Sequence, residues 1–135
     1  MNTTNQTRVM HYAHILYNDN LFPTMTSGER WKACLNEAWE LHYLRQLLAH
    51  GVVEFAYIKQ GSYTIRTARG TNCLDIIPLS KHPNGHQQHL IDAGVEQPNY
   101  KSIAYYDLDK ENWRAFSVTR FVQVKRVMAI TPIEY

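Results

Sequence analysis

The sequence lacks the features that mark several large classes of protein. Its two cysteines, Cys34 and Cys73, fall in different predicted elements and have no metal-binding spacing. We therefore expect reduced, buried thiols in a cytosolic protein. No apolar run approaches the roughly 18–20 residues of a membrane span, and the polar start over residues 1–6 is unlike a signal peptide. These absences favour a cytoplasmic protein that stays where it is made.

An excess of one charge is also missing. The 14 Lys and Arg residues face 12 Asp and Glu residues, a formal net charge of +2, which is too balanced to predict nucleic-acid binding from overall electrostatics. Aromatic residues, in contrast, are abundant. Nine Tyr, three Trp and four Phe residues exceed what a small core needs, so we expect some of them at an interface or a binding face.

Catalytic motifs are absent as well. There is no Gly-x-Ser-x-Gly, no glycine-rich phosphate loop and no His-Glu-x-x-His. Cys34 lies on the apolar stripe of a predicted helix, where it suits packing. Asp107, Asp109 and Glu111 fall in one predicted turn, where carboxylates are common in any case. The sequence therefore predicts a protein that is not an enzyme and needs no cofactor.

Two helices are predicted in the first 50 residues. Apolar residues recur at helical spacing over residues 7–18 and again over residues 29–50. The second helix follows a capping box that begins at Thr26 and ends at Glu29, and Gly51 is expected to end it as a C-terminal glycine. The short link between them predicts a helical hairpin, with enough apolar surface to cover part of a barrel or a second subunit.

The rest of the chain has the pattern of short antiparallel strands. Runs at residues 52–59 and 62–69 flank a break at Gln60 and Gly61, which indicates a hairpin. A second hairpin is predicted at residues 103–118, with further strands at 72–79 and 122–130. The fold class is therefore α+β, with a helical hairpin at residues 1–50 and a small closed antiparallel barrel at residues 51–135.

A polar insertion at residues 80–99 interrupts these strands. It is long for a connection in a compact domain, so it is either mobile or functional. His82, His86 and His89, with Asp92, have separations that zinc sites use. The Pro-Asn-Gly turn between them and the absence of a nearby cysteine favour a polar loop instead. His11 and His14, one helical turn apart, are weaker metal candidates, and we predict no metal site.

Several spaced motifs in the second half of the chain resemble a known family. They are Phe55-x-Tyr57-x-Lys59, Gly61-Ser62, Arg66-x-Ala68-x-Gly70-Thr71, Tyr105-Tyr106-Asp107 and Trp113-Arg114-x-Phe116. The resemblance is to small proteins with an Sm-like SH3 β-barrel, related to the WYL domain and common in Bacteroides-type bacteria and their mobile elements. It covers about residues 51–124 and implies an SH3-like barrel that acts as a binding module. WYL-type barrels are associated with sensing nucleotides or nucleic acid in regulatory proteins.

A cationic patch on the barrel is the candidate ligand site. Strand alternation places Arg66 and Arg69 on opposite faces, so one of them can join the other cations beside a tyrosine. Tyr105 and Tyr106 also point to opposite faces, so we expect one of them to be exposed as a stacking plane. Arginine forks suit phosphate and aromatic planes suit bases. The predicted ligand-binding residues are Lys59, Arg66, Arg69, Tyr105, Tyr106 and Arg114.

Two interpretations of this patch and of the whole protein stay open. The patch can be a solvated face on which Asp107 and Glu54 pair with the arginines. The protein is predicted to be a module that binds a nucleotide or single-stranded nucleic acid in a regulatory, phage or mobile-element accessory role. The alternative is a protein–protein adaptor, or an oligomer-building protein with no small ligand. In both cases we expect self-association through the helical half.

Overall fold

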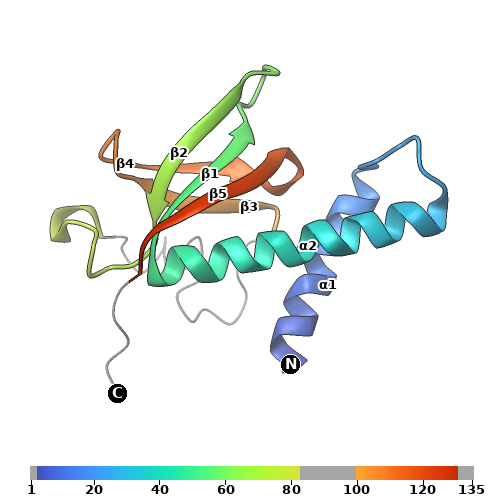
Figure 1. Cartoon of the computed structure of the whole chain (residues 1–135), viewed down its shortest axis with the longest axis horizontal. Coiled ribbons are helices and arrows are strands. Elements are labelled where there is room, and N and C mark those ends of the chain that lie inside the picture. The colour runs from blue at the N-terminus through green and yellow to red at the C-terminus, as the bar shows by residue number, and fades with distance from the viewer. Residues whose placement is uncertain (1–2, 83–99, 131–135) are drawn as a thin grey trace.

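The computed structural model describes residues 3–82 and 100–130, and it places two helices ahead of a five-stranded antiparallel sheet (Figure 1). No strand pair in these ranges is parallel, as predicted. Two short 3-10 turns, η1 and η3, connect the strands. The elements are α1 (Thr3–Asn18), α2 (Ser27–His50), β1 (Gly51–Ile58), β2 (Ile65–Thr71), η1 (Leu79–Lys81), β3 (Ser102–Asp107), β4 (Asn112–Ser117), η3 (Val118–Arg120) and β5 (Phe121–Ile130).

Both predicted helices form, and both begin earlier than expected. The Thr26 hydroxyl accepts a hydrogen bond from the Glu29 amide at 3.4 Å, so Thr26 is the N-cap of α2 as predicted. Gly51 ends α2 as its C-cap, as predicted. Its backbone is extended, with φ at −177°, and it opens β1 directly after α2. The chain therefore passes from helix to strand without a left-handed glycine cap.

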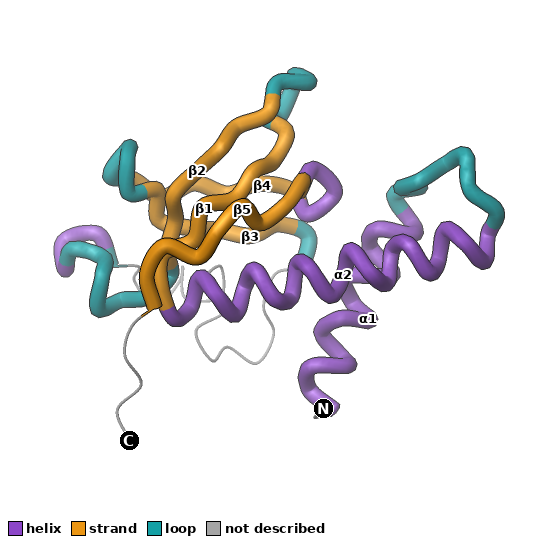
Figure 2. Tube along the Cα trace, in the orientation of Figure 1, coloured by secondary structure: helices purple, strands orange, loops and turns teal. Residues whose placement is uncertain are grey.

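The long helix α2 connects the two halves of the molecule. Its C-terminal half lies along the sheet and contacts β1 and β5, whereas its N-terminal half extends beyond the sheet and packs against α1 (Figures 1 and 2). A buried stripe on each helix makes these contacts possible. The buried apolar residues of the stripes are Val9, Tyr12, Ala13 and Leu16 of α1, and Cys34, Ala38, Leu41, Leu44 and Leu48 of α2.

The sheet has the order β4-β3-β2-β1-β5 and is strongly curled. Two strands separate β1 from β4 in this order, yet the Phe55 and Phe116 rings lie 5.7 Å apart. The curl therefore brings the two hairpins face to face around an aromatic core. Within residues 3–82 and 100–130 no pairing joins β4 to β5, so the barrel keeps an open seam where a closed one was expected.

The strand predicted at residues 72–79 is wrong. The amides of Ile76 and Ile77 both donate to the Cys73 carbonyl, at 3.0 and 3.2 Å, and this makes a turn. Asn72 fixes the start of the segment, since its amide donates to Leu48 O at 2.7 Å and its side chain donates to Ala104 O at 2.8 Å. Local turn hydrogen bonds and the buried Asn72 amide thus replace a strand ladder.

Candidate functional site

Strand register decides which candidate residues share a face. Directly opposed residues of an antiparallel pair point the same way. In β1 and β2, Phe55 faces Ala68 and Tyr57 faces Arg66. In β3 and β4, Tyr105 faces Arg114, next to the Ile103–Phe116 pair. Since these aromatic rings are buried in the core, Arg66 and Arg114 both belong to the inner face of the curled sheet.

Two buried phenols join the hairpins on this inner face. The hydroxyls of Tyr57 and Tyr105 lie 2.6 Å apart and form a hydrogen bond. Burial raises the pKa of Tyr105 far above its ordinary value, and the hydrogen bond to Tyr57 raises this pKa further. The Arg66 guanidinium acts in the opposite direction on the same pKa, so its charge reaches the phenol pair. The Tyr105 hydroxyl is therefore a neutral hydrogen-bonding group beside a cation.

Arg66 carries the least compensated cation of the inner face. Its side chain is half-buried, and within residues 3–82 and 100–130 it forms no hydrogen bond or ion pair. A guanidinium has five N–H donors in a planar fork. Placed beside the phenol pair and without a carboxylate, this fork is free to accept an anionic group.

Arg114 is a second cation on the same face. Its Nε atom lies 3.5 Å from Asp107 Oδ2, but this buried nitrogen makes no hydrogen bond to the described residues. Asp107 is also held by the turn that follows β3, because its Oδ1 accepts the amides of Asp109 and Lys110 at 3.0 and 3.1 Å. The carboxylate therefore has other partners, and the Arg114 donors are only partly used.

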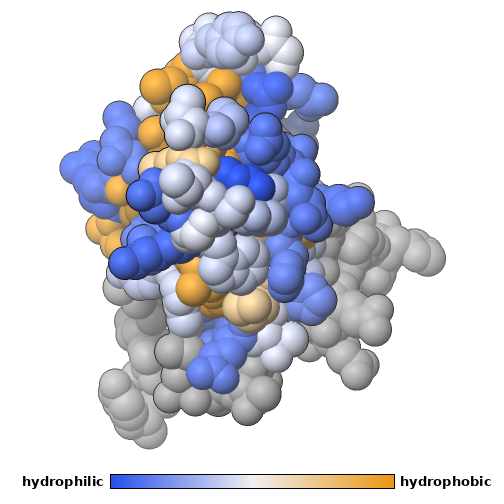
Figure 3. Space-filling view, turned by 90° about the vertical axis from the view of Figure 1, so that its right-hand side faces the viewer, coloured by the Kyte–Doolittle hydropathy of each residue, from blue (hydrophilic) through white to orange (hydrophobic). Residues whose placement is uncertain are grey.

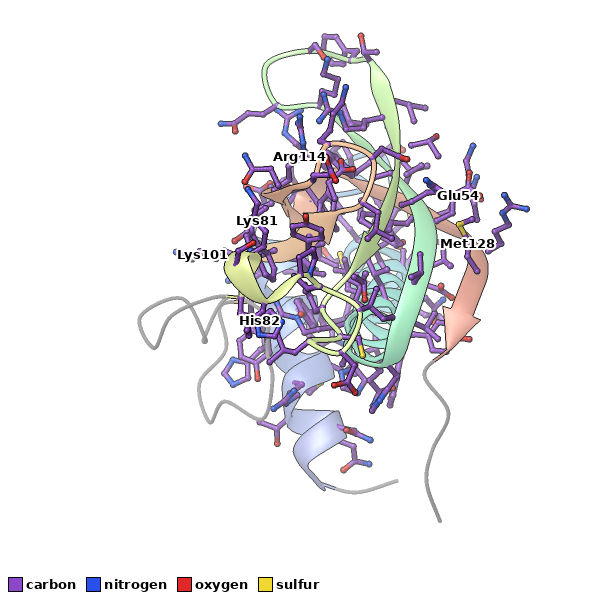
Figure 4. The ribbon with its side chains drawn as sticks, turned by 90° about the vertical axis from the view of Figure 1, so that its left-hand side faces the viewer. Glu54, Lys81, His82, Lys101, Arg114 and Met128 are labelled. Carbon is purple, nitrogen blue, oxygen red and sulfur yellow. The ribbon has the colours of Figure 1, made fainter. Side chains whose placement is uncertain are left out.

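Arg69 lies on the outer face, as the predicted alternation requires. It is opposite Glu54, which in turn is opposite Arg126, and Glu54 accepts a hydrogen bond from Arg126 Nε at 2.6 Å. The Arg69 fork bonds the exposed carboxylate of Asp109 at 3.2 Å, which lowers the pKa of that carboxyl. Figure 4 shows Glu54 and Arg114 on opposite sides of the sheet. Arg69 is therefore ion-paired on a solvated face, as the alternative interpretation expects, but its partner is Asp109 in place of Asp107 or Glu54.

The expected exposed tyrosine is wrong at both positions. Tyr105 and Tyr106 are 0% and 2% exposed. The inner face of β3 is covered by Phe55 and Phe116. On the outer face, the Trp113 ring lies 5.7 Å from Tyr106 and donates to the Lys81 carbonyl at 2.6 Å. Alternation alone could not reveal that both faces of β3 are buried, and neither tyrosine offers a stacking plane.

An exposed aromatic residue exists at a position that sequence reasoning missed. Tyr63 is 98% exposed in the turn between β1 and β2, three residues before Arg66 and close along the chain to Lys59. Gly61, with φ at +77°, shapes this turn. The hairpin projects from the sheet (Figure 1). The signal was present in the sequence, because a tyrosine between Ser62 and Thr64 in a glycine turn has no strand neighbours to cover it.

The histidines occupy packing positions where they are described. His11 stacks on Tyr100 at 4.7 Å, and His14 lies 5.0 Å from Trp31. His82 Nε2 is 2.9 Å from the carbonyl oxygens of Leu74 and Ile77. Most of the predicted insertion, including His86, His89 and Asp92, lies outside the described residues. Within the described part, no three His, Cys, Asp or Glu side chains gather in a way that could hold a metal.

Comparison with known proteins gives one match. Residues 41–122 match the family model described as WYL_2, Sm-like SH3 beta-barrel fold, which confirms the resemblance predicted from the motifs. The match begins in α2 and includes both hairpins with every candidate cation. No curated protein and no solved structure matches the chain significantly. Among the described helices, none has the length and apolar character needed to cross a membrane. A WYL-type Sm-like domain suggests a non-catalytic binding module.

Proposed function

Because the chain belongs to the WYL_2 family with an Sm-like SH3 β-barrel fold, we propose that it is a non-enzymatic module that binds a phosphate-bearing ligand, a nucleotide or a nucleic acid. The ligand binds on the inner face of the curled sheet, beside Arg66 and Arg114. The observation that carries the proposal is the half-buried Arg66 guanidinium, which has no ion pair in the described chain and lies beside the Tyr57–Tyr105 phenols.

The cations on the inner face of the sheet suit a phosphate group better than a neutral ligand group. A guanidinium presents parallel N–H donors that match phosphate oxygens, and charge-assisted hydrogen bonds are the strong ones. Arg114 adds unused donors on the same face, and the exposed Lys59 lies at the end of β1. Tyr63 supplies the exposed ring that Tyr105 and Tyr106 do not. A regulatory or mobile-element accessory role is the setting that we propose for this binding.

The first prediction concerns Arg66. Replacing it with alanine should weaken binding of a labelled ten-nucleotide single-stranded DNA, or of ATP, by roughly 10- to 100-fold. A hydrogen bond to a charged group contributes about 1.5–3 kcal/mol. Fluorescence anisotropy and calorimetry give the two affinities. For the DNA, the magnitude of the slope of log affinity against log salt concentration should also fall by about one, because one phosphate contact is lost.

Arg126→Ala is the matched control for this experiment. It removes an exposed guanidinium from the outer face, where Glu54 is its partner, and should leave binding unchanged. Both variants should unfold within about 0.5 kcal/mol of the native protein. Equal effects of the two substitutions on affinity would contradict the proposed site, as would an Arg66 variant that fails to fold.

Self-association through the helical half is a second proposal, and the outer face of α2 supports it. Tyr43 is 51% exposed there, with Trp39 and Leu47 only partly buried. Figure 3 shows that the end of the molecule where α1 turns into α2 mixes hydrophilic side chains with several apolar patches. An isologous contact between two copies of the outer face of α2 would cover Tyr43, Trp39 and Leu47. This surface is also the one that an adaptor would use.

Light scattering at micromolar concentration measures this association. We expect a mass near twice 15.8 kDa, and we expect Tyr43→Glu to return the protein to a monomer because a charge would be buried in the contact. Tyr63→Glu, at the opposite half, is the control and should leave the mass unchanged. A native protein that scatters as a clean monomer rules the proposal out.

A further inference from the structure

A cavity of about 400 Å³ occupies the open seam of the barrel, between β4 and the end of β1. Ala115, Phe116 and Ser117 all line it, although successive strand residues point to opposite faces. Ser102 of β3, the partner of Ser117, also lines it, so the cavity lies at the end of the β3–β4 pair, where β4 leads into η3. On the other side it meets Ile58, which lies beyond Tyr57, the last β1 residue paired with β5. The cavity is therefore a slot between β4, which pairs only with β3, and the end of β1, where Ile58 pairs with Ile65 of β2 but not with β5.

The edge of β4 is regular, in contrast to the other edge of the sheet. All six β4 residues pair with β3 in one unbroken register. The pairing of β5 with β1 is broken three times, and it skips Val122, Lys125 and Met128. Bulges protect an edge strand from pairing with another chain. Of the two free edges in the described sheet, β4 is thus the one fit to accept an added strand.

One end of the slot carries a fixed positive charge. Arg120, in η3, donates from one guanidinium nitrogen to the carbonyls of Lys59 and Ser62, at 2.9 and 3.5 Å. These bonds hold the side chain in place and use only that nitrogen. Among the residues that the structure describes, no acidic side chain lines the cavity. The remaining donors of Arg120 are therefore pre-organised for an anionic group that enters the slot.

The floor of the slot is apolar. The rings of Tyr57 and Phe116 stack at 4.7 Å with an angle of 13° between their planes, and Ala115 and Ile58 flank them. Gln60, Ser102 and Ser117 add polar groups at the rim. A cavity of this size that combines an apolar floor with several converging polar groups is typical of a ligand site.

We propose that this seam binds the extended C-terminal end of another polypeptide. The peptide backbone adds a strand to β4, its last apolar side chain lies over the Tyr57–Phe116 rings, and its terminal carboxylate pairs with Arg120. A chain end fits better than an internal segment, because the free edge of β4 stops at η3 and a peptide lying along it stops there too. Arg66 and Arg114 do not line the slot, so this inference rests on a different cation from the phosphate site, although Tyr57 contributes to both.

The test uses fluorescein-labelled six-residue peptides that end in Val, Leu, Ile or Phe, each with a free or an amidated C-terminus. Anisotropy should show binding of at least one free-carboxylate peptide and a loss of tenfold or more for its amide. Arg120→Gln should cause a similar loss, whereas Arg126→Gln should cause none. Amide resonances of residues 115–117 should shift on titration, because the added strand bonds to that edge.

Several results would overturn this inference. They are the failure of all four free peptides to bind, equal binding of the amides, and a peptide affinity that falls with Arg66→Ala instead of Arg120→Gln. If the peptide still binds to Arg120→Gln and the amide shifts appear on β5, the added strand lies at the β5 edge and not at the β4 edge. An oligomer that grows with concentration and dissociates in Arg120→Gln would assign the slot to a second copy of the chain. Circular dichroism confirms that the Arg120 variant is folded.

Discussion

Phe55→Ala is expected to lower the free energy of unfolding by about 3–5 kcal/mol. Phe55 is 0% exposed and lies at the centre of the aromatic core, with ring centroids of Tyr105 at 4.9 Å, Phe116 at 5.7 Å and Tyr57 at 6.1 Å. Truncation removes its contacts with both hairpins and leaves a cavity that these large rings cannot fill by small movements. Because domains are stable by only about 5–15 kcal/mol, the loss is a large part of the total.

Urea denaturation followed by tryptophan fluorescence measures this effect. Tyr63→Ala is the control, because it truncates an aromatic side chain that is 98% exposed, and its effect should stay within about 0.5 kcal/mol. If both variants lose the same stability, Phe55 does not hold the hairpins together, and the face-to-face arrangement of the hairpins is wrong.

Gly70→Ala should destabilise the protein by about 1–3 kcal/mol or more, through overpacking. A Cβ atom at this position would lie 2.6 Å from Tyr105 Cδ2 and 3.2 Å from Phe55 Cε1. Both atoms belong to fully buried rings that cannot turn away. The strain would fall at the two positions where β2 pairs with β3, Gly70 with Asp107 and Thr71 with Tyr106. A single methyl group should therefore loosen the link between the hairpins.

The control for this substitution is Gly28→Ala, in the first turn of α2. No atom lies within 4 Å of a Cβ built there, and alanine is a better helix former than glycine. Thermal unfolding should show a lower Tm for Gly70→Ala and an unchanged or slightly higher Tm for Gly28→Ala. A Gly70→Ala protein as stable as the native chain would mean that Tyr105 is not packed against β2.

The parts of the fold that depend on local patterns could be predicted from the sequence. The two helical stripes, the Thr26 cap and the two hairpins are set by spacing within short segments, and all of them were expected close to where they occur. The expected faces of Arg66 and Arg69 follow from strand alternation in the same way. The resemblance carried by the motifs of both hairpins was confirmed by the family match over residues 41–122.

The parts that depend on contacts distant in sequence could not be predicted. Residues 72–79 have strand composition, but their hydrogen bonds go to a local turn, Leu48 and Ala104. Whether a tyrosine on β3 is exposed depends on which residues pack over each face of the strand. Tyr106 is covered by Trp113, which is held in turn by the carbonyl of Lys81, a residue of a remote segment. The slot beside Arg120 exists because β4 and β5 leave a seam, and no pattern within one strand encodes that.

Arginine side-chain NMR tests the phosphate site most directly. The protein is labelled with ¹⁵N and titrated with the ten-nucleotide single-stranded DNA, while the Nε–H resonances of its arginines are followed. We expect the resonances of Arg66 and Arg114 to shift with the same saturation curve, and that of Arg126, held by Glu54 on the outer face, to stay in place. Binding that shifts Arg69 or Arg126 but leaves Arg66 unchanged would contradict the proposed site, and the absence of any shift at saturating DNA would contradict nucleic-acid binding itself.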